Sequence, residues 1–183
     1  MSKINNYAHL VGSIPLDSSV EVFCSVCSSI GSHIKRLPDG ETGERSKWIF
    51  YQRQMLTNHP AMEPDNSISK FQFKQWDGKV IREVRLLRLK DDADTENLIF
   101  PIGYSEHAIE SYKDFSRLQS AGQIPTDVKF QVSLPTPFAT GYNYVSPKGR
   151  EKFLEIYEKS FAVDVAKIMA AIPHDKLAVQ WDV

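Results

Sequence analysis

The segment at residues 37–45 (LPDGETGER) carries the densest group of reactive side chains, with three carboxylates and one arginine around two glycines. A turn that only reverses the chain needs a glycine and at most one aspartate. Asp39, Glu41 and Arg45 are therefore candidates for a polar binding site. The alternative is a solvated turn with a helix N-cap at Thr42, whose first-turn carboxylates offset the helix macrodipole.

Composition limits the class of protein. The chain has 183 residues, 42% hydrophobic and 25% charged, with 22 Lys and Arg against 23 Asp and Glu. A net charge of −1 gives no electrostatic basis for binding nucleic acid or an anionic membrane. No apolar run approaches the ~20 residues of a membrane span, and the polar N-terminus lacks the apolar core of a signal peptide. Two cysteines cannot form a disulfide scaffold, so we expect a cytoplasmic protein.

The pattern predicts strands and helices in alternation, as in a parallel α/β sheet. Residues 8–13 and 34–38 are predicted strands. A capping box at Ser18 and Glu21 begins a helix that ends at Gly31. A second helix opens near residue 46 and ends before Pro60.

Residues 61–94 interrupt this alternation. Aromatic residues at 71, 73 and 76 precede Asp77-Gly78, and a basic-apolar run follows at 80–90. We predict an inserted β-hairpin near residues 70–90, with a type I′ turn at Asp77-Gly78. The basic side chains of the second strand are interpreted as one solvated face of the ribbon.

Further strands are predicted at 98–103, 128–134 and 177–183. A helix capped by Ser105 and ended by Gly122 lies between the first two, and a long helix from Ser146-Pro147 to Pro173 precedes the last. The strand 128–134 is stopped by the prolines at 135 and 137.

Polar groups follow four of the predicted strands. In parallel α/β folds the carboxyl ends of the strands meet at one edge, where ligands bind. The candidate binding residues at these ends are Gly12, Ser13, Asp39, Glu41, Arg45, Ser133, Thr136, Gln180 and Asp182. No catalytic residue and no metal ligand is assigned among them.

Four of these segments occur in a characteristic order: HLVGSIP from residue 9, DGE from 39, VSLPTP from 132 and VQWD from 179. Together they resemble the barrel of cobalamin-independent methionine synthase and its shorter relatives, in the superfamily that includes uroporphyrinogen decarboxylase. The resemblance implies a (β/α)8 TIM-type barrel, here one incomplete domain over residues 1–183. It would comprise a front portion of about four to five strands, with the hairpin insertion at about 61–94.

The resemblance also implies roles. Gly12 and Ser13 would contact the carboxylate of an amino-acid thiol such as homocysteine, and Glu41 and Asp182 would hold its ammonium group. Carboxylates and hydrogen-bond donors suit the two ends of an amino acid. The complete protein would be a methyltransferase in methionine biosynthesis, with a folate as one candidate methyl donor.

The zinc site of the family has no counterpart in this sequence. Family members bind zinc, which activates the thiol, through a His-x-Cys pair, a glutamate and a later cysteine beyond the position of Asp182. The Cys24-x-x-Cys27 pair lies within a predicted helix, so we interpret both cysteines as small buried side chains.

Three interpretations remain open. The first is a zinc methyltransferase of which this chain is the N-terminal part. The second is a catalytically inactive truncated fragment or binding module, which could self-associate through an open sheet edge. The third is a hydrolase on a barrel that uses Asp39, Glu41 and Asp182 as acid and base.

Overall fold

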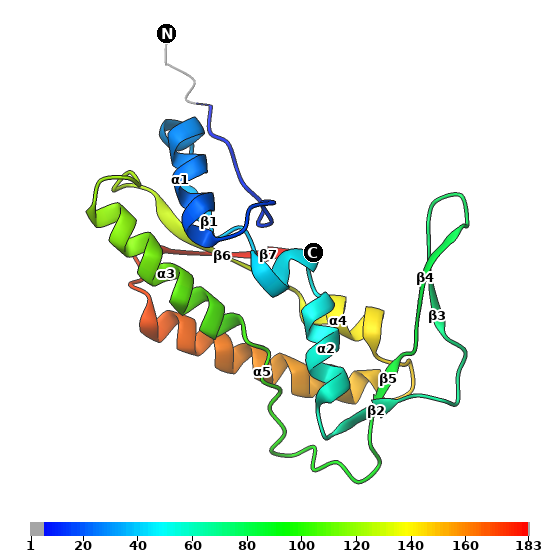
Figure 1. Ribbon diagram of the computed structural model, residues 1–183. Helices are drawn as coiled ribbons and strands as arrows, with labels where there is room; N and C mark the ends of the chain where they lie inside the picture. Colours follow the sequence, from blue (N-terminus) through cyan, green and yellow to red (C-terminus); the bar gives the residue numbers. More distant parts are fainter. Residues whose placement is uncertain (1–5, 183) are drawn as a thin grey trace. The chain divides into compact units, whose positions relative to one another are not determined.

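The computed structural model describes residues 6–182 (Figure 1). These residues divide into two compact units. Unit 1 contains the residues up to Trp48, residues 103–135 and the residues from Val163 onward. Unit 2 contains residues 49–102 and 136–162, and therefore includes the whole predicted insertion at 61–94.

Unit 1 is built on a parallel three-stranded sheet. Its strands are β1 (Arg36–Pro38), β6 (Lys129–Pro135) and β7 (Leu177–Asp182), in the order β1-β6-β7. Both pairings are parallel, so the α/β class predicted from the sequence is confirmed. Within the described residues this sheet does not close into a barrel. Val183, the last residue of the predicted final strand, lies outside the described part of the chain.

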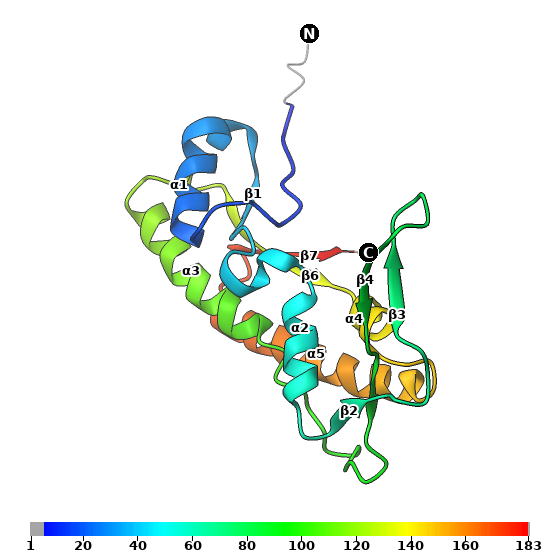
Figure 2. The same cartoon turned by 45° about the vertical axis from the view of Figure 1, so that its right-hand side comes forward.

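Two helices pack against the middle strand of this sheet. They are α1 (Ser19–Ile30) and α3 (Tyr104–Ser120), which lie side by side in Figures 1 and 2. Phe23 of α1, Phe115 of α3 and Phe130 of β6 are fully buried, with ring centroids 5.4–6.2 Å apart. These three rings form the centre of the unit 1 core.

The helix ends are held by polar side chains. The predicted N-cap is confirmed, because the hydroxyl of Ser18 accepts the backbone amide of Glu21 at 3.3 Å. The reciprocal bond of a capping box is shifted by one residue, since the Glu21 carboxylate accepts the backbone amide of Asp17 at 3.1 Å. The prediction that Ser105 caps α3 is wrong, since the helix begins at Tyr104 and its N-cap is Gly103. Instead the amide of Ser105 donates to the buried carboxylate of Asp164, 3.0 Å away on α5 (Arg150–Ala171). A carboxylate at this position also offsets the helix macrodipole.

The predicted strand at 8–13 is not formed. A strand needs its backbone carbonyls for ladder bonds, but here side chains occupy them. The side-chain amide of Gln131 donates to the backbone carbonyls of Leu10 (2.9 Å) and Val11 (3.1 Å). Ser133 and Gln180 donate to the same Val11 carbonyl, at 2.9 and 2.8 Å. The segment is therefore anchored to the sheet by polar side chains instead of pairing as a strand.

Unit 2 contains two short antiparallel ladders and three helical segments. The second helix, predicted to end before Pro60, corresponds to α2. The elements are α2 (Phe50–Asn58), β2 (Met62–Pro64), β3 (Phe71–Lys74), β4 (Val80–Val84), β5 (Leu87–Leu89), α4 (Pro137–Tyr144) and the first part of α5. β2 pairs with β5, and β3 with β4.

The predicted hairpin is confirmed as β3–β4, which extends beyond the β2–β5 ladder (Figure 2). Its turn is not type I′. That turn requires positive φ at both central residues, and of Asp77 and Gly78 only Gly78 has it. The amide of Gly78 donates to the carbonyl of Gln75 (3.0 Å), and the amide of Lys79 donates to the carboxylate of Asp77 (2.9 Å). The loop is thus one residue longer than predicted.

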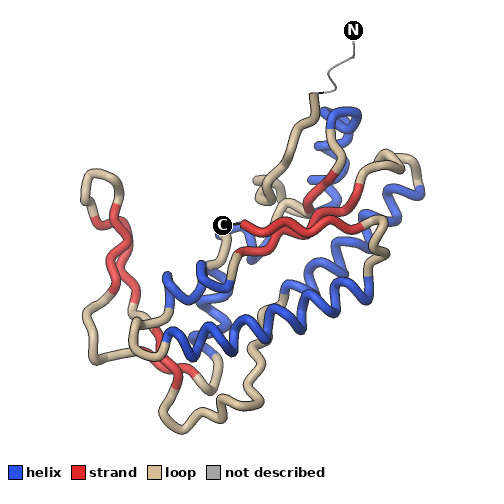
Figure 3. The backbone as a smooth tube through the Cα atoms, turned by 180° about the vertical axis from the view of Figure 1, so that it is seen from behind, coloured by secondary structure: helices blue, strands red, loops and turns tan. Residues whose placement is uncertain are grey.

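The predicted strand at 98–103 is also not formed, and the connection from β5 to α3 is irregular (Figure 3). Phe100 and Ile102 are buried as an apolar strand would be. However, the backbone amide of Phe100 donates to the hydroxyl of Ser160 (2.9 Å), and the carbonyl of Ile102 accepts a hydrogen bond from the side-chain amide of Gln52 (2.6 Å). These side chains satisfy the backbone without a neighbouring strand.

Three further predictions differ from the structure. The prolines at 135 and 137 end β6 but also begin the unpredicted helix α4, with Pro137 in its first turn. The long helix starts at Arg150, after Ser146 and Pro147, and not at them. Cys24 is exposed and Cys27 only partly buried, so the interpretation of both as buried side chains is wrong.

No helix in the described part of the chain is long and apolar enough to cross a membrane.

Candidate functional site

The turn after β1 is buried, unlike a solvated turn. Asp39, Glu41 and Arg45 are only 5, 8 and 8% exposed. Gly40 has φ 82° and Glu41 has φ 51°, and the amide of Glu41 donates to the carboxylate of Asp39 at 3.1 Å. The chain therefore bends sharply inside the unit and directs the Glu41 side chain toward the carboxyl end of the sheet.

Gly40 is the position where this turn is most sensitive to substitution. A Cβ atom there would lie 2.6 Å from a methyl group of Val22, and φ would remain left-handed. We expect Gly40→Ala to lower the free energy of unfolding by about 2–3 kcal/mol, because steric overlap adds to the backbone cost. The matched control is Gly43→Ala: φ is 67° and nothing lies within 4 Å of the added Cβ. Urea unfolding of both variants checks this; equal losses would contradict it.

Asp39 and Arg45 form a buried ion pair behind Glu41. A terminal nitrogen of Arg45 lies 2.6 Å from Asp39 Oδ2, which also accepts the hydroxyl of Ser111 at 2.9 Å. A buried carboxylate requires such a partner to offset its desolvation. These two residues therefore support the turn, with their opposite charges turned to each other.

The segment at Gly12 and Ser13 approaches this turn closely. A Cβ on Gly12 would lie 3.2 Å from the Ser133 side chain and 3.4 Å from Glu41 Cδ, so the backbone is near both. The hydroxyl of Ser13 donates to Glu41 Oε2. At the end of β7, the side-chain amide of Gln180 donates to Asp182 Oδ1 at 2.8 Å.

These segments line an open hollow of about 340 Å³ in unit 1. Two carboxylates, one hydroxyl and two indole residues contribute to it. The lining residues are Val11, Gly12, Ser13, Glu41, Trp48, Trp181 and Asp182. Such a combination of apolar walls with a few converging polar groups is typical of a small-molecule site.

Burial raises the pKa of Glu41 above its ordinary value. The hydrogen bond from Ser13 and the charge of Arg45 act in the opposite direction, while the carboxylates of Asp182 and Asp39 raise the pKa further. The hollow therefore holds a carboxylate whose charge is poorly compensated by the protein. A cationic ligand would compensate it.

The raised pKa predicts a pH dependence of stability. The folded state holds the Glu41 proton more strongly than the unfolded chain does, so this group's contribution to stability falls as pH rises above 4.5. Glu41→Gln cannot ionise and escapes that loss. We expect the stability of this variant relative to wild type to increase between pH 4 and pH 7 in urea unfolding. A difference that stays constant or shrinks over this range would contradict the assignment.

The structure brings together most of the residues predicted from the strand ends. Gly12, Ser13, Glu41 and Asp182 line the hollow. Gln180 and Ser133 lie behind it, bonded to the carbonyl of Val11. Asp39 and Arg45 form the supporting ion pair. Thr136 belongs to unit 2, where it precedes α4. That the hollow binds a substrate stays a prediction.

Sequence reasoning missed Gln131 and Trp48. Gln131 alternates with apolar residues in β6, a pattern that is typical of a strand with one polar face. It is nevertheless 1% exposed and anchors the segment at Leu10 and Val11. Trp48 lies within the second predicted helix, which opens near residue 46, whereas in the structure it precedes α2 and lines the hollow. Lys129 and Ser133 of β6 are polar as well, so the residue types of the strand do not single out Gln131.

The described residues do not fit a zinc ion. Among residues 6–182, no three His, Cys, Asp or Glu side chains lie close enough together to hold a metal. Glu41 and Asp182 supply only two carboxylates to the hollow, and its lining contains neither cysteine nor histidine. Structural and catalytic zinc sites need three or four ligands.

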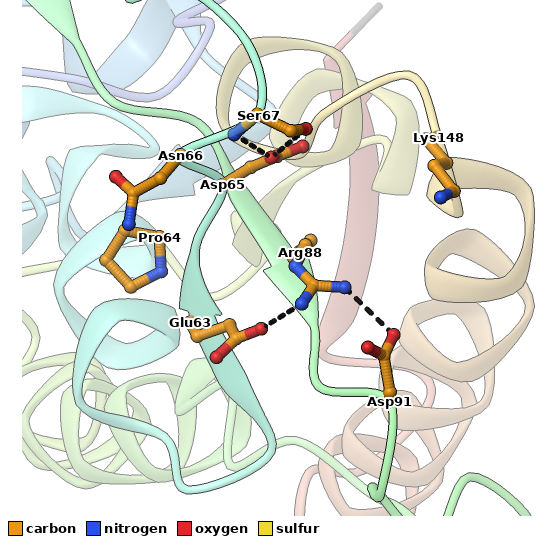
Figure 4. Close-up of a pocket in the computed structure, with 8 residues that line it drawn as sticks. All are labelled: Glu63, Pro64, Asp65, Asn66, Ser67, Arg88, Asp91 and Lys148. Atoms are coloured by element: carbon orange, nitrogen blue, oxygen red, sulfur yellow. Dashed lines mark hydrogen bonds and ion pairs between the residues drawn. The ribbon is translucent and has the colours of Figure 1, made fainter.

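Unit 2 contains a second polar pocket, of about 500 Å³ (Figure 4). Arg88 lies between two carboxylates, 2.5 Å from Glu63 and 2.9 Å from Asp91. Asp65 accepts the amide and the hydroxyl of Ser67 at 2.9 and 2.6 Å. Because these charges and acceptors are largely occupied by one another, this pocket is a weaker candidate than the hollow in unit 1.

Comparison with protein-family models, characterised proteins and solved structures found no match to this chain.

Proposed function

We propose that the chain is a methionine synthase-like protein whose hollow in unit 1 binds an amino-acid thiol such as homocysteine. The observation that carries the proposal is the arrangement of Ser13, Glu41 and Asp182 around one hollow. These are the residues to which the family resemblance assigns contacts with the two ends of an amino acid. The complete activity that we propose is transfer of a methyl group to the thiol.

An ammonium group suits the two carboxylates chemically. Glu41 is buried, and its second oxygen remains after Oε2 accepts the Ser13 hydroxyl. Asp182 is likewise left with one oxygen beyond the bond from Gln180. A primary ammonium donates up to three hydrogen bonds, and bonds to carboxylates are about twice as strong as bonds between neutral groups. Gly12 and Ser13 would meet the carboxylate of the ligand.

The proposal also includes the type of α/β fold, a (β/α)8 barrel. We propose that β1, β6 and β7 are neighbouring strands of a (β/α)8-type barrel, because they are parallel, adjacent and carry their polar residues at the carboxyl ends. Zinc and a folate methyl donor are expected for the family. The described residues do not fit zinc, so the proposal for this chain is limited to the binding of the amino acid.

Binding to a matched pair of ligands tests the proposal. Calorimetric titration should show that L-methionine binds at least tenfold more tightly than 2-hydroxy-4-(methylthio)butanoate, whose hydroxyl replaces the ammonium group. A charged hydrogen bond contributes about 1.5–3 kcal/mol, which corresponds to tenfold or more. Glu41→Gln and Asp182→Asn should each remove most of the preference.

The control variant is Glu110→Gln, at an exposed glutamate on α3. It should bind both ligands as the wild type does. Equal affinity of the wild type for the two ligands, or a preference that survives in both site variants, would show that the carboxylates do not hold an ammonium group.

A further inference from the structure

Trp48 is held in a backbone conformation that side chains rarely adopt. Its φ is 52° and its ψ is −129°. Among the described residues, the non-glycine residues with positive φ are Glu41 and Trp48, and both line the hollow. Backbone strain of this kind persists where the surrounding structure imposes it, and it clusters at ligand sites.

Burial in the core does not account for this conformation. Trp48 is 46% exposed, whereas strained residues with a purely packing role would be enclosed. Its indole group therefore lies at the hollow with much of its surface accessible. An accessible indole beside carboxylates is a favourable place for a cation, since the ring face attracts positive charge.

The charge of the hollow also favours a cationic ligand. Glu41 and Asp182 contribute two negative charges, and the described residues that line the hollow include no Lys, Arg or His. Arg45 is paired with Asp39. An amino acid with an uncharged side chain carries one positive and one negative group, and therefore leaves the net negative charge of the hollow unchanged. A second positive charge on the ligand would correct this imbalance.

We propose that the hollow binds an amino acid whose side chain carries a methylated cation, a sulfonium or a quaternary ammonium group, and that Trp48 contacts this cation. Such a cation has no N–H to donate, so it needs the ring face and the nearby negative charge more than it needs acceptors. The inference rests on the proposed function, because it uses the same hollow and the same contacts to the α-ammonium group.

Three amino acids of similar shape test the proposal by calorimetric titration. S-methyl-L-methionine carries a sulfonium in its side chain. L-ornithine trimethylated at the side-chain nitrogen carries a quaternary ammonium, and L-homoleucine is the neutral counterpart of the sulfonium. We expect at least one of the two cations to bind about tenfold or more tightly than L-homoleucine. The tighter of the two identifies which cation the site takes.

Variants at Trp48 separate ligand contact from a structural role. In Trp48→Leu the preference for the cation should fall below about threefold, while Trp48→Phe should retain part of it because a ring face remains. Trp76→Leu is the matched control, since Trp76 is 98% exposed and lies at the turn of the β3–β4 hairpin in unit 2. Circular dichroism confirms that each variant is folded.

The outcomes distinguish this inference from the proposed function. Equal binding of all three ligands, with L-methionine still preferred over its hydroxy analogue, overturns the cation site and leaves the amino-acid site standing. A preference for the cation that persists in Trp48→Leu overturns the role of Trp48. Failure of every amino acid to bind overturns both proposals.

Discussion

Phe130→Ala is expected to lower the free energy of unfolding by about 3–5 kcal/mol, as large-to-small changes at buried aromatic positions do. Phe130 is fully buried on the middle strand of the unit 1 sheet. Its ring meets those of Phe23, Phe115 and Tyr112 at centroid distances of 6.2, 5.4 and 5.6 Å. The variant would lose the burial of its own ring and leave a cavity among the other three.

Chemical denaturation with urea measures this effect. The matched control is Phe138→Ala, because Phe138 is 52% exposed and its truncation opens no enclosed cavity. We expect the control to lose less than about 1 kcal/mol. A similar loss in both variants would mean that the aromatic cluster is not the centre of the core.

Arg45→Ala is expected to have an effect of the same size, about 3–5 kcal/mol, because it leaves the Asp39 carboxylate buried without its partner. The side chains of Arg45 and Asp39 are 10 and 8% exposed and lie 2.6 Å apart. The hydroxyl of Ser111 and the backbone amide of Glu41 would remain, but these two neutral donors compensate only part of the lost charge.

A double variant tests the cause of this loss. Asp39→Asn combined with Arg45→Gln removes both charges, so we expect it to be more stable than Arg45→Ala alone. Arg117→Ala is the control at an exposed pair with Asp114, where Arg117 is 61% exposed; it should cost less than about 1 kcal/mol. If the double variant were as unstable as Arg45→Ala, the loss would come from packing and not from the unpaired charge.

Local signals in the sequence were reliable where local bonds decide the structure. The capping box at Ser18 and Glu21 predicted the start of α1, and it did so because both partners lie within one helical turn. Apolar periodicity predicted α2, α3 and most of α5. The hairpin was predicted as well, although the turn type depended on the φ of Asp77, which the residue type does not determine.

The sequence alone could not show that the segments 8–13 and 98–103 do not form strands. Both segments are apolar enough to pair, and both are instead bonded by side chains from distant parts of the chain. Gln131 lies 121 residues from Leu10, and Ser160 lies 60 residues from Phe100. Whether a segment joins a sheet depends on which donors the fold brings to its carbonyls.

The amino-acid sequence by itself determined the α/β class and the polar residues at the ends of β1, β6 and β7, because hydrophobic periodicity is a property of the chain. Tertiary structure alone decided which of those residues share a hollow. It placed Glu41 beside Ser13 and Asp182, turned Asp39 and Arg45 toward each other, and added Trp48 through its unusual φ. The physical reason is that charge pairing, burial and backbone strain depend on neighbours in space, which residue types along the chain do not specify.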